Sequence, residues 1–179
     1  MAIIYEKEIK EQEVIDIAKK MLLAARTAPK AKGIDTLSLA IATGDDIKII
    51  SDKLKELAEK TGFKFFIRDA ENILQAQALV MIGTKIKSFG LDCGYCGFDT
   101  CIEKDKHPDV PCVFNTGDLG IAIGSAVSIA TDNRIDNRIM YSVGKAIIEL
   151  GIFDKDVKIV YAMPLSATGK NPFFDRKRK

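Results

Sequence analysis

The sequence predicts an α+β fold in which a mixed sheet is flanked by layers of helices and carries a cysteine-rich insert. Apolar residues recur with helical spacing in some segments and with strand spacing in others along the 179 residues. All four cysteines gather in one segment between a predicted strand and a predicted helix. No repeat or low-complexity linker interrupts the pattern. We therefore expect a single domain over residues 1–179, with the insert at residues 89–114.

Segments whose apolar residues fall on one face at a period of 3.6 predict the helices. Pro29 ends the first of them, because the residue before a proline is pushed out of the helical region. Asp45 or Asp46 is expected to cap the second, and Asn115 or Thr116 the fourth, which is very apolar. The predicted helices cover residues 8–26, 45–60, 69–77, 118–133 and 135–150.

Alternating or continuous apolar runs predict the strands. The run at residues 78–84 is almost wholly apolar and suits the centre of a sheet. Residues 1–5 are expected to form a short strand or an extended arm, and residues 164–179 an irregular tail. The predicted strands cover residues 37–41, 63–68, 78–84 and 157–163.

Composition and charge are those of an ordinary soluble domain. A formal net charge of +2 gives no case for a nucleic-acid partner, and the basic cluster Arg176–Lys179 is expected to be a solvated tail. No uninterrupted apolar run approaches the roughly 18 residues that a membrane span needs, so no membrane partner is expected. Since no apolar signal segment precedes the predicted helices, we expect a cytoplasmic protein.

The four cysteines have the spacing of a single site with four ligands. Cys93, Cys96, Cys101 and Cys112 form the pattern C-x2-C-x4-C-x10-C. Two disulfides are disfavoured, because a reducing cytosol keeps thiols free for metals or catalysis. Four thiolates suit zinc as well as an iron–sulfur cluster, and the spacing alone leaves both open.

The residues between the cysteines favour the cluster. Gly94 and Gly97 directly follow cysteines, so the backbone can bend tightly and bring amide N–H groups close to sulfur. Such hydrogen bonds stabilise the negative charge of thiolate and sulfide. Pro111 gives the loop a stiff return before the last cysteine.

The run CGYCGFDTC resembles the CGxCGxxTC core of a four-cysteine 4Fe–4S module. That module occurs in the B subunit of Rnf-type electron-transport complexes and in the large subunit of the corrinoid iron–sulfur protein. The resemblance implies that Cys93, Cys96, Cys101 and Cys112 bind a 4Fe–4S cluster. The last spacer has ten residues where the module usually has more, which puts Cys112 in question as the fourth ligand.

Three further segments resemble the nitroreductase-type flavoproteins. AARTAPKAKGIDTLSLAIAT is similar to their AAR-x-APS-x-x-N-x-QPW segment, GDLGIAIGSAVSIAT to their central D-x-G-x-A helix, and GIFDKDVKIVYAMPLSATGKNPFFDRK to their closing strand and tail. The likeness implies a nitroreductase-like layered fold and a flavin, FMN. Together with the cysteine insert, it resembles a family of ferredoxin-domain proteins of unassigned function.

The departures from the nitroreductase pattern concern the flavin pocket. No Arg-x-Ser-x-Arg segment for the FMN phosphate precedes Val14, and Lys30, Gly33 and Asp35-Thr36-Leu37 replace the family's Ser, Asn and Gln-Pro-Trp. The pocket is thus either rebuilt or lost, and we expect FMN to bind weakly if at all. The cations that are candidates for holding its phosphate are Arg26, Lys30, Lys32 and Lys170, with solubilising surface charge as the alternative.

Histidine chemistry has a single candidate. His107 is the only histidine and lies in a polar stretch between the third and fourth cysteines, so we expect a solvated loop residue. A general base and a zinc ligand remain the alternatives for it. No catalytic residue is assigned.

Three classes of function remain. The first is an oxidoreductase that exchanges single electrons between the cluster and a flavin, the second a flavin-free electron carrier or redox sensor, and the third a zinc-stabilised structural or interaction protein. We favour an iron–sulfur redox protein with an electron donor or acceptor that the sequence does not identify, in an oxygen-poor cytoplasm. The nitroreductase likeness implies a homodimer.

Overall fold

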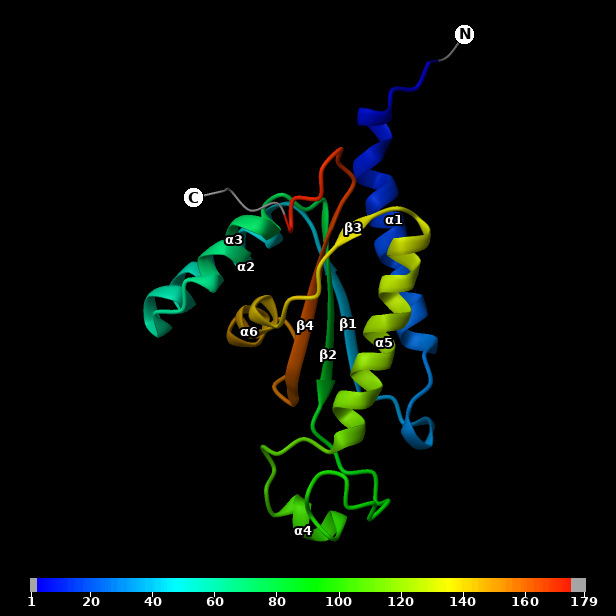
Figure 1. Cartoon of the computed structure of the whole chain (residues 1–179), viewed down its shortest axis with the longest axis vertical. Helices are drawn as coiled ribbons and strands as arrows, with labels where there is room; N and C mark the ends of the chain where they lie inside the picture. The colour runs from blue at the N-terminus through cyan, green and yellow to red at the C-terminus, as the bar shows by residue number, and fades with distance from the viewer. Residues whose placement is uncertain (1–2, 175–179) are drawn as a thin grey trace.

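The computed structural model describes residues 3–174, which form three layers, with helices on both faces of a central sheet (Figure 1). The predicted arm is therefore described only from Ile3, and residues 3–5 have no regular structure. The basic cluster Arg176–Lys179 lies outside the described residues. The helices are α1 (Glu6–Thr27), η1 (a 3-10 turn, Ala31–Gly33), α2 (Gly44–Thr61), α3 (Phe65–Ile73), α4 (Cys101–Asp105), α5 (Val113–Asp132) and α6 (Tyr141–Glu149). The strands are β1 (Leu37–Ala42), β2 (Ala78–Lys85), β3 (Asp136–Asn137) and β4 (Val157–Ser166).

The sheet has the strand order β1-β2-β4-β3 and is antiparallel at each of its pairings, so the prediction of a mixed sheet is wrong. The connection from β1 to β2 explains the direction of that pair. Two helices, α2 and α3, lie in succession between them, so the chain crosses the face twice and enters β2 in the opposite direction. The first residue of β1 pairs with Thr84 near the end of β2, which places β1's start, β2's end and β4's start at one end of the sheet.

Each face of the sheet has its own apolar core. β2 is buried along nearly its whole length, and its side chains alternate between the two cores. Leu79 and Met81 pack with α2, α3 and α6, whereas Val80 and Ile82 pack with α1 and α5. The buried residues of α1, among them Ala18 and Met21, follow the predicted helical period, and the prediction of this helix is confirmed.

Residues 65–68 form the start of α3, so the strand predicted at residues 63–68 is wrong. Phe63 and Phe65 alternate with Lys64, which mimics a strand, but Phe66, Ala70 and Ile73 bury one helical face in the core. The rings of Phe63, Phe65 and Phe66 pack against one another as the chain leaves α2. Contacts between distant residues therefore override the local alternation.

The helix predicted at residues 135–150 is shorter, because its first residues form β3. Asp136 and Asn137 pair with Ser166 and Leu165, so β4 extends past Pro164 into the predicted irregular tail. Pro164 has no N–H to donate. It is tolerated because its nitrogen faces the space between the Asn137–Leu165 pair and the Met140–Ala162 bridge. Residues 167–174 are irregular as predicted.

α5 begins earlier than predicted, with Cys112 as its N-cap rather than Asn115 or Thr116. Its buried face packs against α1 and the sheet, and the hydroxyl of Ser125 donates to the carbonyl of Ala24 at 2.9 Å. Among the described helices, α5 alone has the length and mean hydropathy of a membrane span, with 39% of that window buried in the fold. A core helix passes the same test of length and composition.

Candidate metal centre

The cysteine insert extends beyond one end of the sheet, between the end of β2 and the start of α5 (Figure 1). Four of its residues are left-handed, among them Gly94 (φ 72°) and Gly97 (φ 87°), and the other two are Gly90 and Asp92. Gly94 and Gly97 each directly follow a cysteine, and residues other than glycine rarely adopt this conformation. The turns that follow Cys93 and Cys96 thus depend on glycine, as the sequence suggested.

Side chains of the insert hold its backbone in place around the cysteines. The carboxylate of Asp92 accepts a hydrogen bond from the Cys101 amide at 2.6 Å. The hydroxyl of Thr100 accepts from the Glu103 amide at 3.1 Å and caps α4. Cys112 lies at the N-terminus of α5, whose dipole favours negative charge at that end. Two of the four cysteines therefore lie at the start of a helix.

All four cysteines line one small cavity, which brings together the four predicted metal ligands. Cys112 is buried and the other three are partly exposed, and none forms a disulfide. The side chains of Phe89, Phe98 and Phe114 also line the cavity, and Phe89 and Phe114 meet edge to face at 6.2 Å. The site thus combines four sulfur donors with an aromatic wall.

The thiols are not gathered tightly enough for one ion. Within residues 3–174, no three His, Cys, Asp or Glu side chains lie close enough together to hold a single metal ion. Tetrahedral zinc with Zn–S bonds of about 2.3 Å requires neighbouring sulfurs about 3.8 Å apart. In a 4Fe–4S cluster each thiolate binds a different iron, so the four sulfurs lie further apart. The two candidate groups therefore differ in the sulfur spacing that they require.

Lys104 is buried in the same cavity, which the sequence did not suggest. Only 3% of its surface is exposed, although lysines are rarely buried without a partner. Its Nζ lies 3.6 Å from the carboxylate of Asp105, a side chain that is 58% exposed and also accepts from the Ser88 hydroxyl. A buried ammonium is stable where negative charge is close, so its position favours an anionic occupant.

Asn115 is a second buried donor beside Cys112. Its Oδ1 accepts from the amides of Cys112 and Lys87, both at 3.1 Å, whereas its Nδ2 is buried with no hydrogen-bond partner among residues 3–174. The two amide donors fix which way the side-chain amide is turned. An asparagine three residues after the N-cap is the one signal in the sequence that could have indicated this role.

His107 is not part of the cavity lining. It is exposed, as predicted for a loop residue, and its ring stacks on Phe98 with centroids 5.1 Å apart. Because Phe98 is itself part of the aromatic wall, His107 supports that wall from the solvent side.

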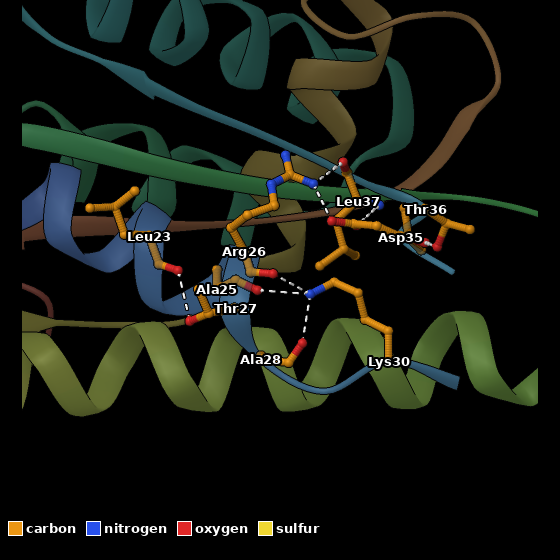
Figure 2. A network of polar contacts seen from close by, with 10 residues as sticks. Leu23, Ala25, Arg26, Thr27, Ala28, Lys30, Asp35, Thr36 and Leu37 are labelled. Carbon is orange, nitrogen blue, oxygen red and sulfur yellow. Dashed lines mark hydrogen bonds and ion pairs between the residues drawn. The ribbon is translucent and has the colours of Figure 1, made fainter. Parts of the chain in front are cut away.

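The segment that resembles the flavin loop holds three of the four predicted phosphate cations, and each has a protein partner. Figure 2 shows the partners of Arg26 and Lys30. The ammonium of Lys30 donates to the carbonyls of Ala25, Arg26 and Ala28, at 3.3, 2.7 and 2.7 Å. It therefore caps the C-terminus of α1, where carbonyls otherwise lack donors.

Arg26 pairs with Asp35 across the same loop, with 2.6 Å between the guanidinium and the carboxylate (Figure 2). Partial burial alone would raise the pKa of Asp35, but hydrogen bonds from Arg26 and the Leu37 amide, with the charges of Arg26 and Lys30, hold that pKa below its usual value. The guanidinium also donates to the Leu37 carbonyl at 3.2 Å.

The loop and the cysteine insert meet at the same end of the sheet. The ammonium of Lys32 donates to the carbonyl of Phe89 at 3.0 Å, and the Phe89 side chain lines the cysteine cavity. The amide of Ala31 donates to the buried carboxylate of Asp118 in α5 at 3.0 Å. These two contacts hold the loop beside the cysteine cavity.

Lys170 lies at the other end of the sheet. It follows β4, whose ten residues run from the end with the insert to the opposite end, a distance of about 30 Å. Lys170 therefore does not share a phosphate site with Arg26, Lys30 and Lys32 of the same chain.

A known protein family matches part of the chain. Residues 108–176 match the model of a family described as uncharacterized protein containing a ferredoxin domain (DUF2148). The matched span includes Cys112 but not the other three cysteines. An uncharacterized protein of Archaeoglobus fulgidus is 43% identical over 182 residues, which cover 97% of each chain.

Solved structures with the same fold are flavoproteins and nitroreductases. A BluB-like flavoprotein of Clostridium difficile has a TM-score of 0.55 at 18% identity and covers 92% of this chain and 84% of its own. A nitroreductase family protein of Clostridium novyi has a TM-score of 0.60 at 17% identity, over 84% and 72%. A nitroreductase with bound FMN from Bacteroides fragilis has a TM-score of 0.60 at 14% identity, over 92% and 82%.

These likenesses confirm the predicted α+β, nitroreductase-like fold. At such low identity they bear on the fold alone. The chain has a nitroreductase-like fold, matches the ferredoxin-domain family model over residues 108–176, and belongs to one family with the Archaeoglobus fulgidus protein.

Proposed function

We propose that this chain is an iron–sulfur redox protein that binds a 4Fe–4S cluster through Cys93, Cys96, Cys101 and Cys112. The observation that carries the proposal is the single cavity lined by all four cysteines and by the buried Lys104. The ferredoxin-domain family and the flavoprotein-like fold support a redox role. Zinc is the alternative, and the glycines that directly follow Cys93 and Cys96 favour the cluster over it.

The residues of the chain have distinct parts in this function. When bound, the cluster accepts and releases one electron at a time. The four thiolates hold it, and Lys104 offsets part of its negative charge. Phe89, Phe98 and Phe114 exclude water from one side of the cavity, which strengthens every charge interaction within it. We expect such a protein to work in a reducing, oxygen-poor cytoplasm.

A second candidate is a flavin-dependent oxidoreductase, favoured by the contact between Lys32 and Phe89. The loop that resembles the flavin segment thus lies beside the cysteine cavity, where a flavin and a cluster could exchange electrons. A nitroreductase of the same fold holds FMN. Tight binding is disfavoured here, because Lys30 already donates to three carbonyls and Arg26 to a carboxylate. We therefore propose that FMN binds weakly.

Anaerobic reductive titration followed by electron paramagnetic resonance tests the redox role. We expect the cluster to take up one electron per chain and to return it on reoxidation. If the metal-loaded protein takes up no electron from a strong reductant and releases none on exposure to air, the proposal is contradicted and a structural metal site is favoured.

Titration of FMN into the cluster-loaded protein separates the two candidates. Charge-assisted contacts to a phosphate contribute about 1.5–3 kcal/mol each, so the loss of two or three would weaken binding by about a hundredfold or more. We expect saturable binding to weaken on Lys32→Ala, because the exposed Lys32 lies beside the cysteine cavity. No change in flavin fluorescence at tens of micromolar would leave the protein as a carrier or sensor.

A further inference from the structure

The cysteine insert is acidic on a chain that is slightly basic. Residues 89–114 contain five carboxylates and two lysines, a formal net charge of −3, whereas the whole chain carries +2. The five acidic residues are all exposed, while Lys104 is buried in the cavity and only Lys106 faces solvent. The acidic residues are Asp92, Asp99, Glu103, Asp105 and Asp109. The surface of the insert is therefore more negative than its composition suggests.

Two large apolar side chains of the insert also face solvent. Tyr95 is 77% exposed and directly precedes Cys96, and Ile102 is 78% exposed and directly follows Cys101. They are the most exposed large hydrophobic residues among those that the structure describes. Each is bonded to a cysteine of the cavity, so each lies close to the proposed cluster. Exposed apolar groups beside charged ones are characteristic of surfaces that bind other proteins.

The insert is also the part of the chain that another protein can reach most easily. It extends beyond the end of the sheet, away from the helices that cover the two faces (Figure 1). Electron transfer requires the partner's redox group to come close to the cluster. The end of the molecule that carries the insert meets this requirement.

We propose that the insert is the docking surface for a protein electron donor or acceptor that presents basic side chains around an apolar centre. The proposal rests on the proposed function, since the electron that leaves the reduced cluster is the one that the oxidised partner gains. The carboxylates attract and orient the partner, and Tyr95 and Ile102 contribute apolar contact once it is bound. A second copy of this chain is disfavoured as the occupant, because two acidic inserts repel each other.

Electron transfer to cytochrome c, a basic one-electron acceptor protein, tests the proposal with a neutral quinone as the small-molecule control. The test variant is Asp99→Lys with Glu103→Lys, two exposed residues of the insert that do not line the cysteine cavity. The control is Glu59→Lys with Glu71→Lys, two exposed residues of α2 and α3 with the same change in total charge. Iron and sulfide are measured in every variant before the kinetics.

We expect the second-order rate constant for cytochrome c to fall with ionic strength in the natural protein and to be at least tenfold lower in the insert variant. The control variant should change it less than threefold, and neither should change the rate with the quinone. Ile102→Ser should lower the cytochrome c rate without changing its salt dependence.

Equal losses in the two charge variants would overturn the proposal, because they would reflect total charge alone. A dimer that separates on Asp99→Lys with Glu103→Lys would also overturn it and assign the insert to a second copy. A protein without iron would overturn the function and the docking surface together. Intact iron with a charge-insensitive rate would overturn the docking surface alone.

Discussion

Lys104 is the cation among the residues that line the cysteine cavity. Reduction adds negative charge to a cluster, and a buried ammonium stabilises that charge more than an exposed one because the surroundings screen it less. We expect Lys104→Met to lower the midpoint potential. A tenfold fall in the ratio of reduced to oxidised cluster corresponds to about 59 mV for one electron.

Lys106→Met is the matched control, since Lys106 is exposed at the end of the same helix. Its effect on the midpoint potential should be a minor fraction of the effect at Lys104, and Lys104→Arg should retain most of the natural value. The account of Lys104 fails if both methionine variants shift the potential equally, as measured by redox titration with electron paramagnetic resonance.

Cys112 is the cysteine whose role the shorter spacer puts in question, and the structure places it in the cavity with the other three. We expect Cys112→Ser to lose or convert the cluster as severely as Cys93→Ser, since serine oxygen is a poorer ligand for iron in a sulfur-rich site. Iron per chain and the visible absorption spectrum measure this. An unchanged spectrum in Cys112→Ser would show that another group supplies the fourth ligand.

At the scale of elements, α6 lies so close to β4 that only glycine fits at one position. A Cβ on Gly144 would lie 1.8 Å from the carbonyl oxygen of Val160, which is main chain and cannot turn away. We expect Gly144→Ala to lower the free energy of unfolding by about 3 kcal/mol, at the upper end of overpacking effects. Thermal or denaturant unfolding measures it.

Gly117→Ala is the control for that substitution, because nothing lies within 4 Å of a Cβ at Gly117 in α5. Alanine is the better helix former there, so it should raise the free energy of unfolding by about 0.5–1 kcal/mol. If Gly144→Ala is as stable as the natural protein, the close approach of α6 to β4 is wrong.

The spacing of apolar residues predicted best the elements whose buried residues follow a regular helical or strand period. α1, α2 and the central strand β2 carry such a pattern and agree with the prediction. α3 does not, because the alternation of Phe63 and Phe65 is local, while the core decides the conformation of the residues that follow. β3 was missed since two residues carry no period, and only their pairing with β4 defines them.

At the scale of the whole molecule, the outer face of α5 is free of charge. Its exposed residues up to Thr131 are small or uncharged, which would let the backbone of a second copy approach closely. We propose that the protein is a homodimer through this face. Ile121→Lys should convert the dimer to a monomer in sedimentation, because it places a charge in the interface.

Ile49→Lys is the matched control for the dimer. Ile49 in α2 is 53% exposed and Ile121 is 49% exposed, but α2 covers the opposite face of the sheet. The control should leave the dimer intact. A natural protein that sediments as a monomer, or two variants that behave alike, would rule out this interface.

The sequence alone identified the cysteines and the flavin-like loop but not their arrangement. That both lie at one end of the sheet follows from the register of β1 with β2, which no local pattern encodes. The pairing of β4 with β2 carries the chain to the opposite end of the sheet, which separates Lys170 from Arg26, Lys30 and Lys32. The burial of Lys104 was also beyond the sequence, because lysines on polar loops are normally exposed.

The metal content of protein purified without oxygen tests the central claim most directly. If Cys93, Cys96, Cys101 and Cys112 hold a 4Fe–4S cluster, the protein is brown and contains iron and acid-labile sulfide in equal amounts, four of each per chain. Stoichiometric zinc without sulfide, in protein never exposed to air, would contradict the account.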